Sequence, residues 1–244
     1  MEPEVYTRHL ENEESHWWFR GRREIIRSVV KKNFSNGDKK INILDFGAGS
    51  GTNIQMLNSF GNVYVYEKNK KISDFLKEKF KSSENIKIVE DFNNKGFFDL
   101  IVVADVIEHI KEDKLVLNQL SNSLKKNGKL LLTAPAYQFL FSNKDVALHH
   151  YRRYTKFSLN KLFEENYTIL KSSYFNFFLF LPLCILILIM KILKIQFIDS
   201  VEKKPNFLVN TFLYLIFFSE SILLKFINLP FGISILTFCE KKNQ

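Results

Sequence analysis

The run INILDFGAGSG, residues 41 to 51, joins a short apolar stretch to a loop with glycine at every second position, Gly47, Gly49 and Gly51. A β-branched apolar run of this length is typical of a buried strand. Alternate glycines allow a sharp turn into a helix and let backbone N–H groups approach a ligand closely. Thr52 stands where a third glycine would complete the dinucleotide fingerprint, which disfavours a plain NAD site.

Further apolar runs follow, with helix-like stretches between them. Strands that alternate with helices predict a parallel sheet covered on both faces, with the ligand beyond the carboxyl ends of the strands. The predicted strands cover 41–46, 62–67, 85–90, 98–104 and 128–135, and later 167–175 and 232–238. The predicted helices cover 53–60, 73–83, 113–127 and 156–165, the third with apolar residues at Leu115, Leu117, Leu120 and Leu124.

The composition limits the class of protein. At 244 residues and 46% hydrophobic content, the chain is expected to form one main folded domain. A net charge of +9 favours an anionic partner, such as nucleic acid, a membrane surface or a phosphorylated substrate. Cys184 and Cys239 fit neither a disulfide framework nor a zinc pattern. The N-terminal segment has no apolar run of a secretory signal, so we expect residence on the cytoplasmic side.

Glu67 ends the second predicted strand about twenty residues after Gly47, where a carboxylate can accept hydrogen bonds from two vicinal ribose hydroxyls. This spacing indicates a nucleoside ligand. The segments LDFGAGSG (44–51), YVYEKN (64–69), FDLIVVADVIEHI (98–110) and LKKNGKLLLTAPA (124–136) resemble the successive motifs of class I S-adenosylmethionine-dependent methyltransferases. The resemblance covers about residues 41–170, and PFGISILTFCEKK (230–242) resembles the last strand of that family.

The resemblance implies a Rossmann-like, seven-stranded α/β methyltransferase sheet, methyltransferase activity and S-adenosyl-L-methionine as the cofactor. It also implies that Asp45 and the loop residues Gly47, Ala48, Gly49 and Gly51 hold the methionine part, while Glu67 holds the ribose. Asp91 would contact the adenine amino group, with Phe92 beside the ring, and Asp105 would face the reacting centre. The chain departs from the family after Glu67, where Lys68 and Asn69 replace an apolar pair; Lys68 is kept among the cofactor-binding candidates.

Methyl transfer from a sulfonium requires alignment with the acceptor and, where a proton is released, a base. Imidazole titrates near neutral pH, so His109, His149 and His150 are candidate bases, with Asp145 as a further candidate catalytic residue. His109 alternatively starts a helix and packs locally. We expect no metal ion at Glu108 and His109, because no further ligands stand at metal-binding spacing.

The stretch from 134 to 158 is long for a connection, and long loops at a ligand edge are often functional. In one interpretation Tyr154 packs inward and the arginines are solvated. In the other, Arg152 or Arg153 grips an anionic group of the acceptor, with Asp145 or His149 near the nucleophile. The HxRRYT run in this stretch and HWWFRGRR (16–23) resemble a bacterial branch of the family associated with lipids and cell-surface glycans.

Both tryptophans of the chain lie side by side in HWWFRGRR and need a cover for their large apolar faces. We expect residues 1–38 to form a helical cap in which Trp17 and Trp18 exclude water. Arg20 or Arg22 would then lie near the methionine carboxylate or the acceptor. The alternative is an amphipathic helix that only packs on the core.

Residues 178–228 are predicted to be an apolar insertion in a domain made of residues 39–177 and 229–244. A bilayer span needs about twenty apolar residues, whereas Pro182, Lys191, Glu220 and Lys225 interrupt the two apolar runs. We favour a hairpin that dips into one leaflet. A spanning hairpin and a buried interface between two copies of the chain are the alternatives.

These features predict a membrane-associated methyltransferase that acts on an oxygen of a lipid or lipid-linked acceptor, at the cytoplasmic side of the inner membrane. A polyprenyl quinone precursor is an alternative acceptor, because DVIEHI (105–110) is similar to the motif of that O-methyltransferase group. A non-catalytic cofactor-binding membrane protein and an RNA methyltransferase are further alternatives. We expect no nucleic-acid partner, since an Asn-Pro-Pro-Tyr base-flipping motif is absent from the sequence.

Overall fold

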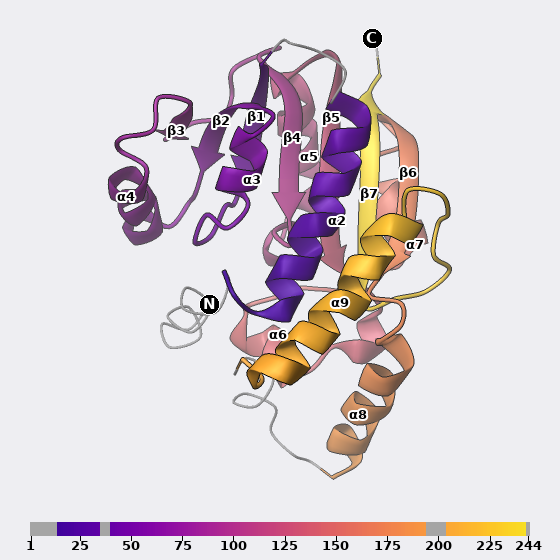
Figure 1. Cartoon of the computed structure of the whole chain (residues 1–244). Coiled ribbons are helices and arrows are strands. Elements are labelled where there is room, and N and C mark those ends of the chain that lie inside the picture. The colour runs from indigo at the N-terminus through magenta and orange to yellow at the C-terminus, as the bar shows by residue number, and fades with distance from the viewer. Residues whose placement is uncertain (1–13, 35–39, 194–203, 243–244) are drawn as a thin grey trace.

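A seven-stranded sheet in the order β3-β2-β1-β4-β5-β7-β6 forms the centre of the computed structural model (Figure 1), which describes residues 14–34, 40–193 and 204–242. The pairs from β3 to β5 are parallel, and β7 runs antiparallel between β5 and β6. This topology confirms the predicted Rossmann-like fold. The strands are β1 (Ile41–Phe46), β2 (Gly61–Tyr66), β3 (Ile86–Val89), β4 (Phe98–Ala104), β5 (Leu124–Pro135), β6 (Tyr167–Phe175) and β7 (Ser234–Lys241).

Helices cover both faces of the sheet and extend beyond one end of it (Figure 1). In the described ranges they are α2 (Trp17–Phe34), α3 (Ile54–Asn58), α4 (Lys70–Lys79), α5 (Asp113–Ser123), α6 (Asn143–Ala147), α7 (Lys156–Lys161), α8 (Phe180–Ile192) and α9 (Phe207–Leu223). Two short 3₁₀ turns, η1 (Ile107–His109) and η2 (Gln138–Leu140), follow β4 and β5.

Three strands, β1, β4 and β6, have the bounds expected from the sequence, whereas the boundary between α5 and β5 was predicted wrongly. The helix ends at Ser123 and the strand begins at Leu124, because Leu124 pairs with Phe98 of β4. Sheet pairing overrides the helical periodicity at this point. Leu115, which the same periodicity suggested as an apolar contact, is 57% exposed.

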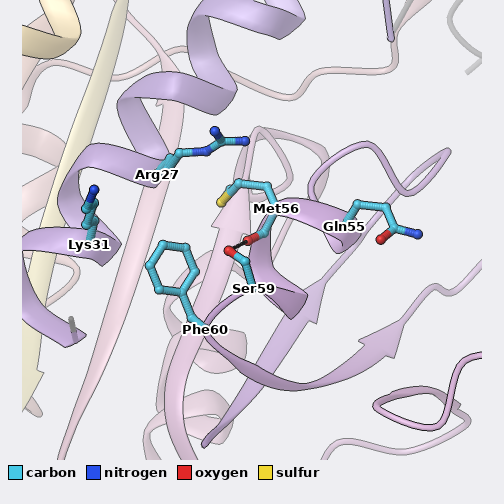
Figure 2. Close-up of a pocket in the computed structure, with 6 residues that line it drawn as sticks. All are labelled: Arg27, Lys31, Gln55, Met56, Ser59 and Phe60. Carbon is cyan, nitrogen blue, oxygen red and sulfur yellow. Dashed lines mark hydrogen bonds between the residues drawn. The ribbon is translucent and has the colours of Figure 1, made fainter. Parts of the chain in front are cut away.

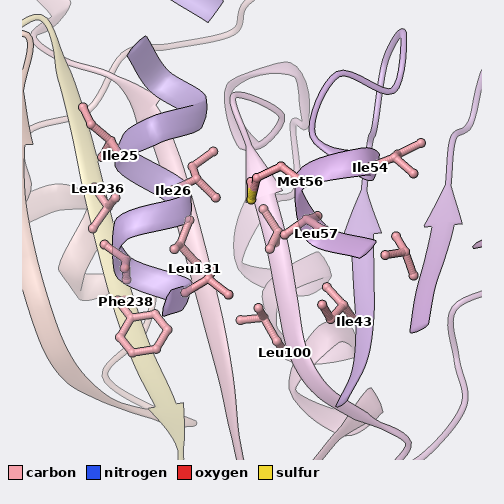
Figure 3. Close-up of a cluster of buried hydrophobic side chains, with 14 of the residues drawn as sticks. Ile25, Ile26, Ile43, Ile54, Met56, Leu57, Leu100, Leu131, Leu236 and Phe238 are labelled. Atoms are coloured by element: carbon pink, nitrogen blue, oxygen red, sulfur yellow. The ribbon is translucent and has the colours of Figure 1, made fainter. Parts of the chain in front are cut away.

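The sheet buries apolar side chains on both faces because neighbouring residues of a buried strand point in opposite directions. On one face, α2, α3 and α4 pack against strand residues such as Ile43, Leu100 and Leu131 (Figure 3). On the other face, α5 and α7 pack against the alternate residues, including Leu44 and Leu130. The two layers hold the carboxyl ends of β1, β2, β4 and β5 at one edge of the sheet.

Helix α9 packs over Trp17 and Trp18. It lies along α2 (Figure 1), and its fully buried Phe217 contacts the rings of Trp17 and Trp18 at centroid distances of 5.8 and 5.3 Å. The Trp17 N–H also donates to Asn210 Oδ1 at 2.9 Å. A Cβ at Gly21 would lie 2.2 Å from the Phe217 ring, so glycine permits the close approach of the two helices. Part of the apolar insertion therefore belongs to the main core.

The rest of the insertion leaves large apolar side chains in solvent. They lie on α8, at Leu193 directly after it, and on α9. In the parts of the chain that the structure describes, no helix combines the length and the hydropathy required to cross a membrane. The exposed apolar residues here are Leu181, Ile185, Leu186, Leu188, Ile189, Ile192, Leu193, Phe207, Leu208, Val209, Phe212, Leu215 and Ile222.

Candidate active site

The glycine loop forms a turn with small side chains at the carboxyl end of β1. Gly47 has a φ of 74° and donates its N–H to the Tyr66 carbonyl at 2.8 Å. A Cβ at Gly47 would lie 2.7 Å from Cγ1 of Val106, in the segment after β4, so a larger residue would force a shift. Asp45 is buried directly before the turn. The loop continues through Ala48, Gly49, Ser50 and Gly51 to α3.

Glu67 follows β2 and bridges two backbone N–H groups with its carboxylate. Its Oε2 accepts from Gly49 at 3.0 Å, and its Oε1 accepts from Asn69 at 2.9 Å. Asn69 caps α4 by accepting the N–H of Lys71 at 3.0 Å, while the Lys68 side chain is exposed. The structure thus places the acid expected to bind ribose directly against the glycine loop.

Aromatic rings pack at the neighbouring carboxyl ends of β1, β2 and β3. The Phe92 centroid lies 5.0 Å from that of Phe46 and 4.8 Å from that of Tyr66. Phe92 is only 8% exposed, so most of its surface is used in this cluster. Asp91 beside it is exposed and accepts the Asn93 N–H at 3.0 Å. Both residues reach the same edge of the sheet as Glu67.

Asp105 stands at the end of β4 in the left-handed backbone region, with a φ of 55°. Its N–H donates to the Thr133 carbonyl at 3.1 Å, and the Thr133 hydroxyl donates to its Oδ1 at 2.8 Å. The Arg22 guanidinium donates to its Oδ2. Residues outside the common backbone regions cluster where function requires a fixed side chain, and the three contacts hold this carboxylate in one orientation.

The HWWFRGRR segment reaches this edge through its arginines. Arg22 is buried against Asp105, and Arg23 donates to the Thr52 carbonyl, beside the glycine loop, at 3.1 Å. Trp17 and Trp18 pack instead on Phe217. The predicted role of the two tryptophans in excluding water from the cofactor stays a prediction.

Glu108, His109 and His150 form a compact cluster next to Asp105. A backbone hydrogen bond from the Tyr151 N–H to the Glu108 carbonyl, 2.8 Å long, joins the late loop (residues 136–155, between β5 and α7) to η1. It brings His150 Nε2 to 4.0 Å from Glu108 Oε1 and the two imidazole centroids to 4.5 Å. Sequence reasoning named His150 only as one of three candidate bases, because no local pattern connects it to Glu108.

Asp145 holds His150 in place. This fully buried carboxylate accepts from His150 Nδ1 at 2.8 Å and from both Nε and Nη2 of Arg153, at 2.8 and 2.9 Å. Burial alone would raise the pKa of Asp145, but the hydrogen bonds from His150 and Arg153 lower it below its usual range. The charged Asp145 therefore fixes the orientation of both partners.

The remaining predicted residues of the late loop are also paired within the protein. Arg152 donates to Asp113 Oδ2 at 2.9 Å, and the buried Tyr154 hydroxyl donates to the same oxygen at 2.9 Å. His149 is exposed, with a φ of 58°, and lies outside the cluster of Glu108, His109 and His150. The binding of an acceptor by Arg152, Arg153 and Tyr154 stays a prediction, as does a catalytic role for His149.

Burial shapes the ionisation of Glu108 and His109. Desolvation, aided by repulsion from Asp105, raises the pKa of Glu108 well above its ordinary value. Desolvation, aided by His150, lowers the pKa of His109 to about 4. A ring with this pKa is neutral at physiological pH, where it is a weak proton acceptor with a free lone pair.

A hollow of about 400 Å³ lies elsewhere, between α2 and the C-terminal end of α3 (Figure 2). None of the predicted site residues lines it. Its open, shallow form gives a small molecule few converging polar groups, so we do not regard it as the active site. The lining residues are Arg27, Lys31, Gln55, Met56, Ser59 and Phe60.

Comparison with known proteins identifies the family of the chain. A family model described as a methyltransferase domain matches residues 18–170, well over half of the chain. The match includes the glycine loop, Glu67, Asp105 and the late loop. No match was found among curated proteins.

Solved structures share the fold at low sequence identity. The N-methyltransferase NodS from Bradyrhizobium japonicum, in complex with S-adenosyl-L-homocysteine, has a TM-score of 0.58 and 12% identity, with 98% of each chain covered. Phosphoethanolamine N-methyltransferase 2 from Haemonchus contortus, in complex with S-adenosyl-L-methionine, has a TM-score of 0.56 and 16% identity, with 90% of this chain and 52% of that chain covered. YcgJ protein from Bacillus subtilis has a TM-score of 0.54 and 12% identity, with 90% of this chain and 99% of that chain covered.

Proposed function

Because the chain belongs to the class I S-adenosylmethionine-dependent methyltransferases, we propose that it methylates a hydroxyl oxygen of a lipid or lipid-linked acceptor at the cytoplasmic face of a membrane. When bound, S-adenosyl-L-methionine supplies a methyl group already activated on a sulfonium. As the C–O bond forms, the C–S bond breaks, S-adenosylhomocysteine leaves and the hydroxyl proton passes to a base or to water. The protein mainly has to align the two reactants.

The residues at the edge of the sheet fit this cofactor. A side chain at Gly47 would fill the turn in which the methionine part is expected, and Glu67 offers carboxylate oxygens beside the Gly49 N–H. Arg22 and Thr133 fix the Asp105 carboxylate at the methionine end. These residues bind and orient the methyl donor, and they keep water out where they are buried.

The position of the apolar insertion is the observation that carries the choice of a lipid acceptor. Helix α8 and the start of α9 lie at the same end of the molecule as the carboxyl ends of β4 and β5 (Figure 1). Tyr137, two residues after β5, contacts Phe180 of α8 at a centroid distance of 5.6 Å. An acceptor held in a membrane by its apolar chain would therefore present its head group near Asp105.

The exposed side chains of α8 and α9 support membrane contact. Apolar helical faces that lie in the interface of a bilayer bind through buried apolar area and through attraction to anionic lipids. The chain has a net charge of +9, which fits an anionic surface.

Labelled methyl transfer tests the acceptor class. The full-length protein is incubated with methyl-labelled S-adenosylmethionine and either a membrane lipid extract, polyprenyl quinol precursors or RNA, and mass spectrometry identifies the product. We expect an O-methylated product in the lipid extract. Label confined to the quinol precursors or to RNA, or no product despite cofactor binding, would contradict the proposal.

Sedimentation with anionic vesicles tests the membrane contact. Each exposed apolar side chain buried in lipid contributes about 1.5–3 kcal/mol, so the change of Leu208 and Phe212 together to Glu should weaken vesicle binding by tenfold or more. Leu115→Glu is the matched control, because Leu115 is equally apolar and exposed on α5. Equal binding of all three proteins would refute the role of the insertion.

A further inference from the structure

We propose that Glu108, His109 and His150 bind a divalent transition-metal ion such as Zn²⁺. One carboxylate oxygen and one nitrogen of each imidazole all lie within 4.8 Å of one another. Zinc at about 2.0–2.2 Å from each ligand needs the ligand atoms to lie about 3.3 Å apart, a distance that small side-chain rotations reach. This inference concerns metal binding and goes beyond methyl transfer.

The orientation of both imidazoles fits metal ligands. A metal-binding histidine usually donates its second ring N–H to a carboxylate or a carbonyl, which fixes the ring and leaves the other nitrogen free. His150 Nδ1 lies 2.8 Å from Asp145 Oδ1, so its Nε2 points toward Glu108. The backbone of Leu148 lies near the His109 ring and acts to raise its pKa. His150 therefore has one anchored nitrogen and one nitrogen that faces Glu108, and one nitrogen of His109 lies within 4.8 Å of both other ligand atoms.

The third proposed ligand, Glu108, is a buried carboxylate with too few hydrogen-bond partners. Glu108 is 1% exposed, and its Oε2 has no hydrogen-bond partner among the residues that the structure describes. A buried carboxylate oxygen without a partner is costly. The nearby guanidinium groups of Arg22 and Arg153 bind Asp105 and Asp145 instead. A cation in the cluster would satisfy Glu108.

The identity of the ligands selects the kind of metal. Imidazole suits zinc, iron, cobalt and nickel, whereas magnesium and calcium prefer oxygen ligands alone. Three protein ligands leave a coordination position for water or a substrate oxygen. If the proposed function holds, an acceptor hydroxyl bound there would lose its proton more readily, because a metal ion lowers the pKa of a bound hydroxyl. Metal binding itself does not depend on that function.

Cobalt provides the direct test, since Co²⁺ in a site of low coordination number has visible absorption bands. The full-length protein is treated with a chelator, dialysed and titrated with Co²⁺, and Zn²⁺ binding is measured by calorimetry and by competition with Co²⁺. We expect one ion per chain. If neither Co²⁺ absorption nor Zn²⁺ calorimetry shows binding of one ion per chain, the proposal is overturned.

Variants of the cluster assign the ligands. Glu108→Gln, His109→Ala and His150→Ala should each weaken metal binding by at least about tenfold, and Asp145→Asn by about 10–100-fold, through the orientation of His150. His149→Ala is the matched control, because His149 adjoins His150 in sequence but lies outside the cluster. An equal loss in the His149 variant would refute the site. Glu108→Gln preserves the shape of the side chain, and circular dichroism verifies its folding.

Two readouts separate this proposal from the proposed function. Stoichiometric metal binding without methyl transfer to lipid would support the metal site and contradict the lipid acceptor. Methyl transfer to lipid by a protein that binds neither Co²⁺ nor Zn²⁺ would contradict the metal site alone.

Discussion

Replacing Gly21 by Ala tests the packing of α2 on α9. In an ordinary helix interior this change is stabilising, by about 1 kcal/mol. At Gly21 the new Cβ would lie 2.2, 2.5 and 2.8 Å from three carbons of Phe217. We therefore expect the sign of the effect to reverse.

The surroundings of Phe217 determine the magnitude. The ring is fully buried, contacts Trp17 and Trp18, and stacks on Phe175 at a centroid distance of 6.0 Å. Because these rings leave it little room to move, the strain should approach the upper end of the range of about 1–3 kcal/mol for overpacking. After subtraction of the gain in helix propensity, the net loss of stability is about 2 kcal/mol.

Thermal and urea unfolding measure this change in the purified chain. For a protein of this size, about 2 kcal/mol corresponds to a decrease in melting temperature of about 4–8 °C. Arg27→Ala, at an exposed position of the same helix, is the control and should change stability little. The double variant Gly21→Ala with Phe217→Leu should recover part of the loss. A Gly21→Ala protein more stable than the wild type would refute the reasoning.

Three further changes probe the site and the insertion. Gly47→Ala, with a Cβ 2.7 Å from Val106, should abolish S-adenosylhomocysteine binding in calorimetry, whereas Gly96→Ala, also at positive φ but in open space, should retain it. Arg22→Ala leaves Asp105 without its cation and should weaken binding of the same ligand at least tenfold; unchanged affinity would show that the pair is unnecessary. Burial raises the pKa of Glu220, so the stabilising contribution of this side chain is present at low pH and is lost as pH rises. The stability of Glu220→Gln relative to the wild type, measured by urea unfolding, should therefore increase between pH 4 and pH 8.

Local chemistry explains why much of the sheet was predictable. β1 and β4 are mainly apolar runs bounded by polar residues and turns, and the structure keeps their predicted bounds, as it does those of β6. The glycine loop and Glu67 are also local signals, since the spacing of the strand, turn and acid places them together in any parallel sheet of this kind. The end of α5 was less predictable because pairing of Leu124 with Phe98 competes with helical periodicity.

The site required contacts between segments far apart in the chain. The sequence marked Arg22 as a candidate, but only the packing of α2 brings it to Asp105. The cluster of Glu108, His109 and His150 likewise depends on the hydrogen bond from Tyr151 to Glu108. No metal-ligand spacing in the sequence predicts this cluster, because its residues come from two segments that are far apart in the chain.

The sequence by itself determined the parallel part of the sheet, from β3 to β5, the glycine turn after β1 and the acid after β2, because backbone sterics and the alternation of apolar residues act over a few neighbours. Only the tertiary structure decided that Phe217 covers Trp17 and Trp18 and that His150 lies beside Glu108. Such contacts are selected by the packing of whole helices and loops, a sum over many distant pairs that leaves no local signature.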